Sequence, residues 1–187
     1  MLSLQKKRAQ MGVINNRIEK HGDQDVTAFD IPIEMLLDPE ELNDLLGDKY
    51  AHRALFDTKG NVATPMLPML AAMSLTHDLD EATVTLHLAG GTELEYEDVR
   101  LKGLRIAPIH GGETELTFKL QILPKTPQYA KLINAQVSEI QLSLADAKVA
   151  EKRKDKQQQL DLGEGAEGGS DESAPRKSRN GAQPEAH

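Results

Sequence analysis

The sequence contains no cysteine and no tryptophan, and it has only three phenylalanines and three tyrosines in 187 residues. The lack of cysteine excludes a disulfide framework, a thiolate metal site and a thiol nucleophile, and it fits a reducing compartment. The scarcity of aromatic residues leaves the core to Leu, Ile, Val, Met and Ala. It also leaves few surfaces on which nucleotide bases can stack.

Long hydrophobic runs are also missing. The most apolar stretch, residues 66–75 (MLPMLAAMSL), is too short to span a bilayer and is interrupted by Pro68. At the N-terminus, Lys6, Lys7 and Arg8 stand where the apolar segment of a signal peptide would begin. These absences favour a soluble cytoplasmic protein that makes no membrane contact.

The chain has 30 acidic and 22 basic residues, which gives a formal net charge of -8 at pH 7. Before Glu151 there are 22 acidic and 15 basic residues, and from Glu151 onward there are eight and seven, so the excess belongs to the body. An acidic body repels phosphate at long range. Non-specific nucleic-acid binding is therefore disfavoured, although a local basic stripe is compatible with this charge.

The residue pattern divides the chain into four segments. Residues 1–16 form a basic N-terminal segment and a candidate first strand, and residues 17–144 alternate as an antiparallel β domain does. Residues 145–162 are rich in charge, and we interpret them as a helical extension. Residues 163–187 contain Gly, Ser, Pro and charged residues with no apolar face, which predicts a disordered tail.

Two short helices are expected inside the β domain. Asp38 is a good N-cap, Pro39 suits the first helical position, and Glu41 completes a capping box. These residues predict a helix near 39–46. A Thr-Pro pair predicts the start of a second helix near 127–135.

The remaining pattern is that of strands. Residues 82–97 form an expected β-hairpin, because apolar and polar residues alternate on both sides of a Gly-Gly turn. In the next strand the apolar phase slips by one residue at Gly103, which predicts a β-bulge there. Residues 50–56 are a candidate strand, and Pro32 indicates an edge strand.

The short turns between these strands demand antiparallel neighbours. We therefore expect a mainly β (α+β) fold, either an antiparallel β-sandwich or a partly open barrel, with two short helices and a disordered C-terminal tail.

No pattern in the sequence points to a reaction. The six histidines do not lie at metal-binding spacings, and there is no P-loop and no nucleophile elbow. His77, Asp78 and Asp80 carry donors that suit a divalent ion, but they lack the other parts of an EF-hand, and a solvated loop is favoured. We expect no catalytic residue, no metal and no cofactor.

Two further features have alternative interpretations. Glu93, Glu95 and Glu97 share one strand face, where a charged outer surface is favoured over acid–base chemistry. For the methionine-rich stretch 64–75, the favoured interpretation is an irregular segment that closes one end of the core. The alternative is a partner-binding surface.

One group of residues favours nucleic acid. Arg100, Lys102 and Arg105 surround the predicted bulge, and Lys119 projects outward from a strand that can lie beside it. We take these four residues as the candidate nucleic-acid-binding site of an otherwise acidic domain. Tyr96 is the only aromatic residue near Arg100, Lys102 and Arg105 in sequence, and a solvated outer face is the favoured alternative.

Two long segments, NNRIEKHGDQDVTAFDIPIEM and LEYEDVRLKGLRIAPIHGGETELTFKLQILP, are followed by an expected short helix and strand. In this order they resemble a family of small phage and prophage proteins of uncharacterised function, over roughly residues 12–144. The likeness is one of pattern without a catalytic signature, and no functional residue is carried over. It implies an accessory factor from the DNA-metabolism part of a phage genome, acting in the cytoplasm of a bacterial host.

These features together favour a non-enzymatic accessory binding protein of a phage or prophage. Its partner would be nucleic acid, single-stranded DNA included, or a protein of replication or recombination. The alternative is a virion or assembly component that acts through protein contacts alone. An enzyme ranks third, and a homo-oligomer is compatible with each function.

Overall fold

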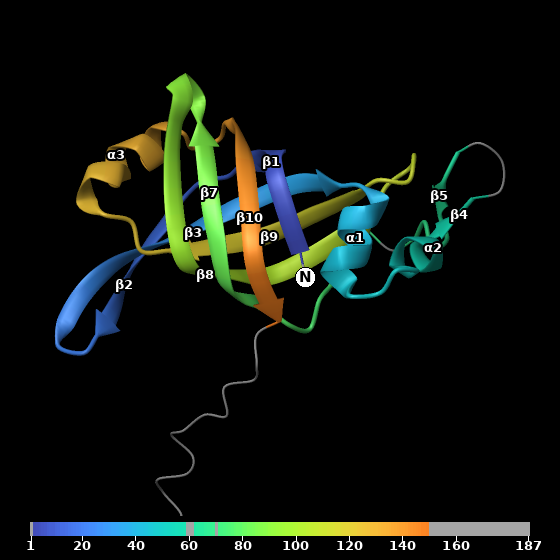
Figure 1. Ribbon diagram of the computed structural model, residues 1–187, viewed down its shortest axis with the longest axis horizontal. Coiled ribbons are helices and arrows are strands. Elements are labelled where there is room, and N and C mark those ends of the chain that lie inside the picture. The colour runs from blue at the N-terminus through green and yellow to red at the C-terminus, as the bar shows by residue number, and fades with distance from the viewer. Residues whose placement is uncertain (1, 59–61, 70, 150–187) are drawn as a thin grey trace, which may run out of the picture. The chain divides into compact units, whose positions relative to one another are not determined.

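Six strands close into an antiparallel barrel in the computed structural model, which describes residues 2–58, 62–69 and 71–149 (Figure 1). Each strand pairs with the next around the ring, and the pairing of the last strand with the first closes it. In spatial order the strands are β1 (Leu2–Met11), β10 (Glu139–Val149), β7 (Leu79–Leu88), β8 (Thr92–Pro108), β9 (Thr114–Ile122) and β3 (Gln24–Leu37).

Shorter strands lie beside the barrel. β2 (Asn15–His21) pairs with the first half of β3 and forms a hairpin that extends beyond the ring (Figure 1). β6 (Met73–Ser74) pairs with β8, and β4 (Phe56–Asp57) pairs with β5 (Thr64–Pro65) as a small second sheet. A 3-10 turn, η1 (Ala89–Gly91), joins β7 to β8.

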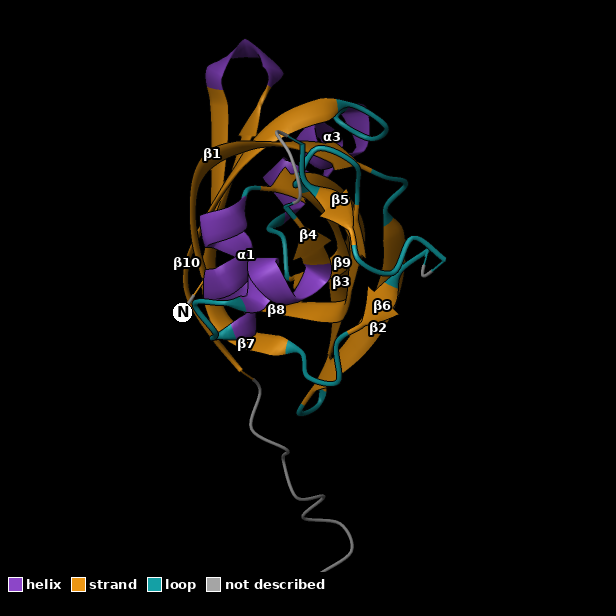
Figure 2. Ribbon diagram, turned by 90° about the vertical axis from the view of Figure 1, so that its right-hand side faces the viewer, coloured by secondary structure: helices purple, strands orange, loops and turns teal. Residues whose placement is uncertain are grey.

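Helices cover the two ends of the barrel. α1 (Pro39–Leu46) lies across one end, where Leu42 is fully buried, and α2 (Ala51–Leu55) follows it (Figure 2). α3 (Thr126–Asn134) lies at the other end, where the ring of Tyr129 packs 5.0 Å from that of Phe29.

The capping box at the start of α1 is confirmed. The Asp38 carboxylate accepts hydrogen bonds from the backbone N–H groups of Glu40 and Glu41, at 3.1 and 3.0 Å. The Glu41 carboxylate in turn accepts one from the backbone N–H of Asp38 at 2.9 Å. Three backbone donors that the helix itself leaves unpaired are therefore satisfied.

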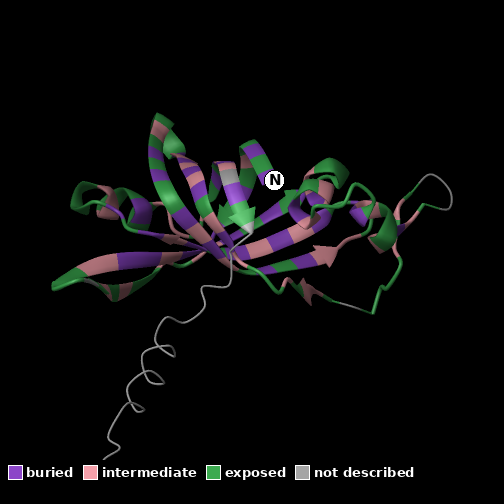
Figure 3. Ribbon diagram, turned by 60° about the horizontal axis from the view of Figure 1, so that its bottom comes forward, coloured by how far each residue is buried: buried purple, intermediate pink, exposed green. Residues whose placement is uncertain are grey.

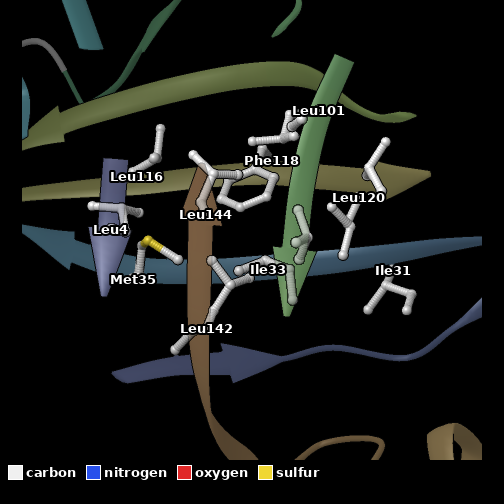
Figure 4. Packing of buried hydrophobic residues seen from close by; sticks show 14 of the residues in the cluster. Leu4, Ile31, Ile33, Met35, Leu101, Leu116, Phe118, Leu120, Leu142 and Leu144 are labelled. Atoms are coloured by element: carbon white, nitrogen blue, oxygen red, sulfur yellow. The ribbon is translucent and has the colours of Figure 1, made fainter. Parts of the chain in front are cut away.

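The barrel interior is filled by aliphatic side chains from alternate positions of the strands (Figure 4). In β9, for example, Leu116, Phe118 and Leu120 are buried, whereas Thr117 and Lys119 between them are not. Figure 3 shows the same bands along the other strands. Successive residues of a strand point to opposite faces, so side chains at every second position face the core.

The predicted bulge at Gly103 is confirmed. The pairing of β8 with β9 shifts register between Lys102 and Arg105, and Gly103 has a φ of 62°. Leu101 before the bulge and Leu104 after it are both 1% exposed, so the bulge takes up the extra residue and the apolar side chains face inward on both sides. The mainly β, antiparallel fold is confirmed as well, and the barrel is closed rather than partly open.

Three local expectations differ from the structure. Residues 51–55 form helix α2 instead of a strand, because Asn43 and Asp48 accept hydrogen bonds from the backbone N–H groups at the start of that turn. Pro32 does not lie on a sheet edge. It stands where β3 changes its partner from β2 to β1, so a missing donor is tolerated inside the sheet.

The third difference concerns the segment predicted to be a helical extension. Its first residues, 145–149, continue strand β10, because Lys148 and Val149 pair with Asp80 and Leu79 at the start of β7. The rest of that predicted extension and the predicted disordered tail lie outside the described residues. At the other terminus, the basic segment forms β1, which is a member of the ring.

Candidate nucleic-acid interface

The outer face of β8 and β9 brings together three of the four cations that the sequence singled out. Lys102 and Lys119 lie directly opposite each other in the antiparallel pairing of the two strands. Arg105 follows just after the bulge and lies opposite Thr117. The bulge therefore places Arg105 on the same outer face as the two lysines, whereas an uninterrupted alternation would turn it inward.

Arg100, the fourth candidate cation, is already engaged in an ion pair and is not free to bind an anion. Its guanidinium forms a two-pronged ion pair with the carboxylate of Asp80 on β7, through Nε to Oδ1 and through Nη2 to Oδ2, the second at 3.2 Å. A bidentate pair of this kind is among the stronger surface interactions. Asp80 neutralises the charge of Arg100, so Arg100 is not one of the free cations of this face.

Lys102, Arg105 and Lys119 have no ion-pair partner among the described residues. Arg105 and Lys119 are exposed, and Lys102 is half-buried. Like charges directly opposite each other across two strands destabilise the sheet. The fold therefore places two cations where an anion would relieve their repulsion.

A shallow groove of about 290 Å³ runs beside these cations. Arg105 and Lys119 line it together with Thr117 and the bulge at Gly103, and Glu34 of β3 stands on its other side. Gly12 forms part of the wall where the backbone of β1 approaches β3, and a side chain there would meet Pro32 at 3.0 Å. The groove thus offers two cations and a hydroxyl to a ligand, with one carboxylate opposing an anion.

A second acidic residue near this face is already neutralised. The Asp30 carboxylate accepts hydrogen bonds from Arg17 Nε at 3.1 Å and from Gln121 Nε2 at 2.8 Å. Burial alone would lower the pKa of Arg17, but its hydrogen bonds and charge interactions with Asp30 and Glu19 outweigh burial and raise the pKa. Arg17 therefore stays charged and continues to neutralise Asp30.

Aromatic rings do not contribute to this interface. Phe118 lines the groove but is only 4% exposed, because its side chain belongs to the barrel core. Tyr50, which the sequence pattern did not single out, is an exposed aromatic residue elsewhere on the surface. It lies between Lys49 and Arg53, with Lys49 Nζ 4.8 Å from its ring centroid. Cations interleaved with an aromatic residue are a signal for base stacking that 49–53 (KYAHR) already carried.

The structure also assembles a polar cluster from three strands that the sequence did not predict. His87 Nδ1 lies 2.9 Å from Glu93 Oε1, and His87 Nε2 lies 2.9 Å from Ser143 Oγ. The hairpin register pairs His87 with Glu93, but only the tertiary structure brings Ser143 beside them. The hydrogen-bonded chain from Ser143 through His87 to Glu93 has the residue types of a catalytic triad. None of the three residues lines either of the grooves beside β8, however. Ser143 Oγ also accepts a hydrogen bond from the Lys6 backbone N–H, so the cluster joins β1, β7, β8 and β10.

The other candidates from the sequence have structural roles. Asp78 accepts a hydrogen bond from the Gly103 backbone N–H at 3.1 Å, and Asp80 binds Arg100. In the part of the chain that the structure describes, no three His, Asp or Glu side chains gather as metal ligands would.

The methionine-rich stretch does not close the core as expected. Met66, Leu67 and Met69 are 51%, 62% and 95% exposed, whereas Met73 and Leu75 pack against the core. The first three side chains lie on the surface, which favours the alternative of a partner-binding segment.

None of the helices in residues 2–58, 62–69 and 71–149 has the length and apolar character needed to cross a membrane. No protein-family model matches the chain, and no match is found among curated proteins or among solved structures.

Proposed function

We propose that this protein is a non-enzymatic binding protein that holds single-stranded nucleic acid by its phosphates on the outer face of β8 and β9. The observation that carries the proposal is the pair Lys102 and Lys119, two cations that face each other without an acidic partner among the described residues. Arg105 adds a third charge at the bulge. Phosphate groups of a strand passing over this face would separate the lysine charges.

The mode of binding follows from what surrounds the cations. No exposed aromatic ring lines the groove, so the energy comes from phosphate contacts rather than from base stacking, and little sequence preference is expected. The acidic body opposes the approach of a polyanion. Affinity should therefore be modest and steeply dependent on salt.

The biological setting that we propose rests on the resemblance of residues 12–144 to small phage and prophage proteins. In that setting the protein is an accessory factor in the cytoplasm of a bacterial host, and it acts during replication or recombination. The partner in this setting can also be a protein of the same process. Met66, Leu67 and Met69 would then supply an exposed apolar contact.

The test is a fluorescence-anisotropy titration of the full chain with a labelled single-stranded oligonucleotide and with its duplex, at low and moderate salt. For three phosphate contacts, the logarithm of the binding constant should fall with the logarithm of salt concentration with a slope of about -2 for the single strand. The double variant Lys102→Glu/Lys119→Glu should weaken binding by about a hundredfold, since two attractive contacts become repulsive.

The matched control is Lys20→Glu/Lys131→Glu, which makes the same change of net charge at two exposed lysines on β2 and α3. It should retain most of the affinity. Equal losses in both double variants would show that only the overall charge matters, and this would refute the site. Absence of binding at low salt would refute direct nucleic-acid binding altogether.

A virion or assembly component is the second candidate, and the exposed apolar side chains of Met66, Leu67 and Met69 favour it. It predicts a defined oligomer, measured by light scattering, that Leu67→Asp/Met69→Asp dissociates. A monomer at all concentrations that also fails to co-purify with particles would exclude this function.

A further inference from the structure

The first half of β8 has a free edge. Residues 92–99 pair with β7 on one side, where Glu95 lies opposite Thr85 and Tyr96 opposite Val84. On the other side, the pairing with β9 begins only at Arg100, opposite Gln121. No described strand therefore pairs with that side of residues 93–98, where the backbone presents donors and acceptors to a possible additional strand.

A groove follows this edge. It has a volume of about 530 Å³ and lies between residues 95–99 of β8 and the segment that runs from the end of β9 into α3. Gln121, Leu123 and Gln128 form the opposite wall. A bulge at Glu97 and Asp98, where the pairing with β7 shifts register and Asp98 has a φ of 53°, ends the regular part of this edge. The regular residues before it, 93–96, extend over about 13 Å in a strand, which is enough to pair with a short extended peptide.

The rim of the groove is acidic. Glu95, Glu97 and Asp98 line it and are exposed, and none of them has an ion-pair partner in the described part of the chain. Lys125 is the one cation among the residues that line the groove. The negative charge of this rim therefore exceeds the positive charge, and it favours a cationic occupant.

The floor of the groove is apolar with one unused polar group. Val99 and Ile122 are buried, and Leu123 is 45% exposed. Tyr96 is 8% exposed, and its buried hydroxyl has no hydrogen-bond partner among the described atoms. Buried hydroxyls usually have a partner, so this one is a donor that the described atoms leave unused.

We propose that the groove takes an extended, basic segment of a partner protein, which pairs with residues 93–96 of β8 as an additional strand. Alternate Lys or Arg side chains of that segment face Glu95 and Glu97, and the small apolar side chains between them lie on Leu123 and the floor. Main-chain hydrogen bonds supply affinity, and the alternation of side chains supplies specificity. The proposal is independent of the nucleic-acid interface, which lies on the other half of β8.

The competing explanation is that the glutamates only protect a free edge from pairing with other chains, as charged residues do on many edge strands. That explanation predicts no binding by any basic peptide. A second copy of this chain is the other occupant to test, because β2 also has a free edge.

The probe is a fluorescein-labelled, acetylated octapeptide of alternating lysine and valine, titrated into the full chain at low salt. The alternating peptide should bind, and a peptide with the same residues in two blocks should bind at least about tenfold more weakly. N-methylation of the amides on one edge of the alternating peptide should abolish binding, because those amides would pair with β8. On binding, hydrogen exchange at residues 93–96 should slow.

The variant Glu95→Lys/Glu97→Lys should weaken binding of the alternating peptide by about tenfold or more. Its matched control is Glu113→Lys/Glu139→Lys, which makes the same charge change at exposed positions outside the groove. Circular dichroism shows whether each variant is folded, and the N-methylated peptide tests the proposal on the unaltered protein in any case.

Four results would overturn the proposal. The first is absence of binding by the alternating peptide at low salt. The second is equal binding by the alternating, block and N-methylated peptides. The third is an equal loss of affinity in both charge-reversed variants. The fourth is a dimer of the free protein that Glu95→Lys/Glu97→Lys dissociates, since a second copy would then occupy this edge.

Discussion

Replacing Gly103 by alanine should destabilise the protein by about 1–2 kcal/mol, the cost of holding a residue with a Cβ in the left-handed region. Gly103 has a φ of 62°, and a Cβ added there meets nothing within 4 Å. Steric overlap therefore contributes nothing, and the hydrogen bond from the Gly103 N–H to Asp78 is retained. Gly103→Asn should cost less than Gly103→Ala, because asparagine tolerates this conformation better than other residues.

Insertion of an alanine after Gly103 tests the register rather than the conformation. The bulge takes up one extra residue, so a second extra residue inverts the alternation that follows, and Leu104 and Ile106 turn outward while Arg105 turns into the core. Exposing each aliphatic side chain costs about 1.5–3 kcal/mol. Burying an unpaired guanidinium adds several kcal/mol, and the whole stability of a domain is about 5–15 kcal/mol. We expect the insertion variant to lose cooperative folding.

The assay is urea unfolding of the full chain, followed by circular dichroism because the protein has no tryptophan. The expected order of stability is wild type, Gly103→Asn, Gly103→Ala and then the insertion, with the largest step before the insertion. An alanine variant as stable as the wild type would refute the role of the left-handed conformation. An insertion variant no less stable than Gly103→Ala would refute the role of the bulge in setting the register.

Two further variants test the cap and the buried hydroxyl. Asp38→Ala should cost about 1 kcal/mol at neutral pH. Burial alone would raise the pKa of Asp38, but hydrogen bonds from Glu41 and Glu40 and the charge of Lys7 outweigh it and lower the pKa. The cap's contribution is therefore complete above the usual carboxyl pKa and is lost as the pH falls below it, so urea midpoints between about pH 5 and pH 3 should converge for the two proteins; parallel curves would contradict this. Burial raises the pKa of Tyr96 to about 12, so the neutral hydroxyl is favoured in the folded state and that stability is lost as the pH rises above about 10. Tyr96→Phe should raise stability at neutral pH by about 1 kcal/mol, because it removes a buried hydroxyl without a partner, and it should flatten the alkaline loss. A less stable variant in the same urea assay would mean that the hydroxyl is hydrogen-bonded in solution.

Features that depend on neighbouring residues were predictable from the sequence. Asp38 and Glu41 are three positions apart, so the capping box can be recognised from the sequence alone. The hairpin of β7 and β8 and the bulge at Gly103 also follow from alternation and glycine positions within a short stretch. The same alternation indicated that Lys102 and Lys119 point outward.

Helix α2 shows where local reasoning was insufficient. Residues 50–56 are compatible with a strand, but the side chains of Asn43 and Asp48 accept hydrogen bonds that begin a helical turn instead. Those partners come from α1 and from the loop that follows it. The choice therefore depends on where α1 ends, which a propensity argument over 50–56 does not include.

The sequence by itself determined the mainly β character, the antiparallel strands, the capped helix α1 and the outward direction of the candidate cations. All of these depend on side-chain periodicity and on hydrogen bonds between residues close in sequence. Only the tertiary structure decided that β1 pairs with both β10 and β3, so that the barrel closes, and that Arg100 is neutralised by Asp80. The physical reason is distance along the chain: Leu2 pairs with Ala147, and contacts over such a separation leave no local pattern to read. The free edge of β8 likewise depends on the tertiary structure, because it exists only where β9 no longer pairs with β8.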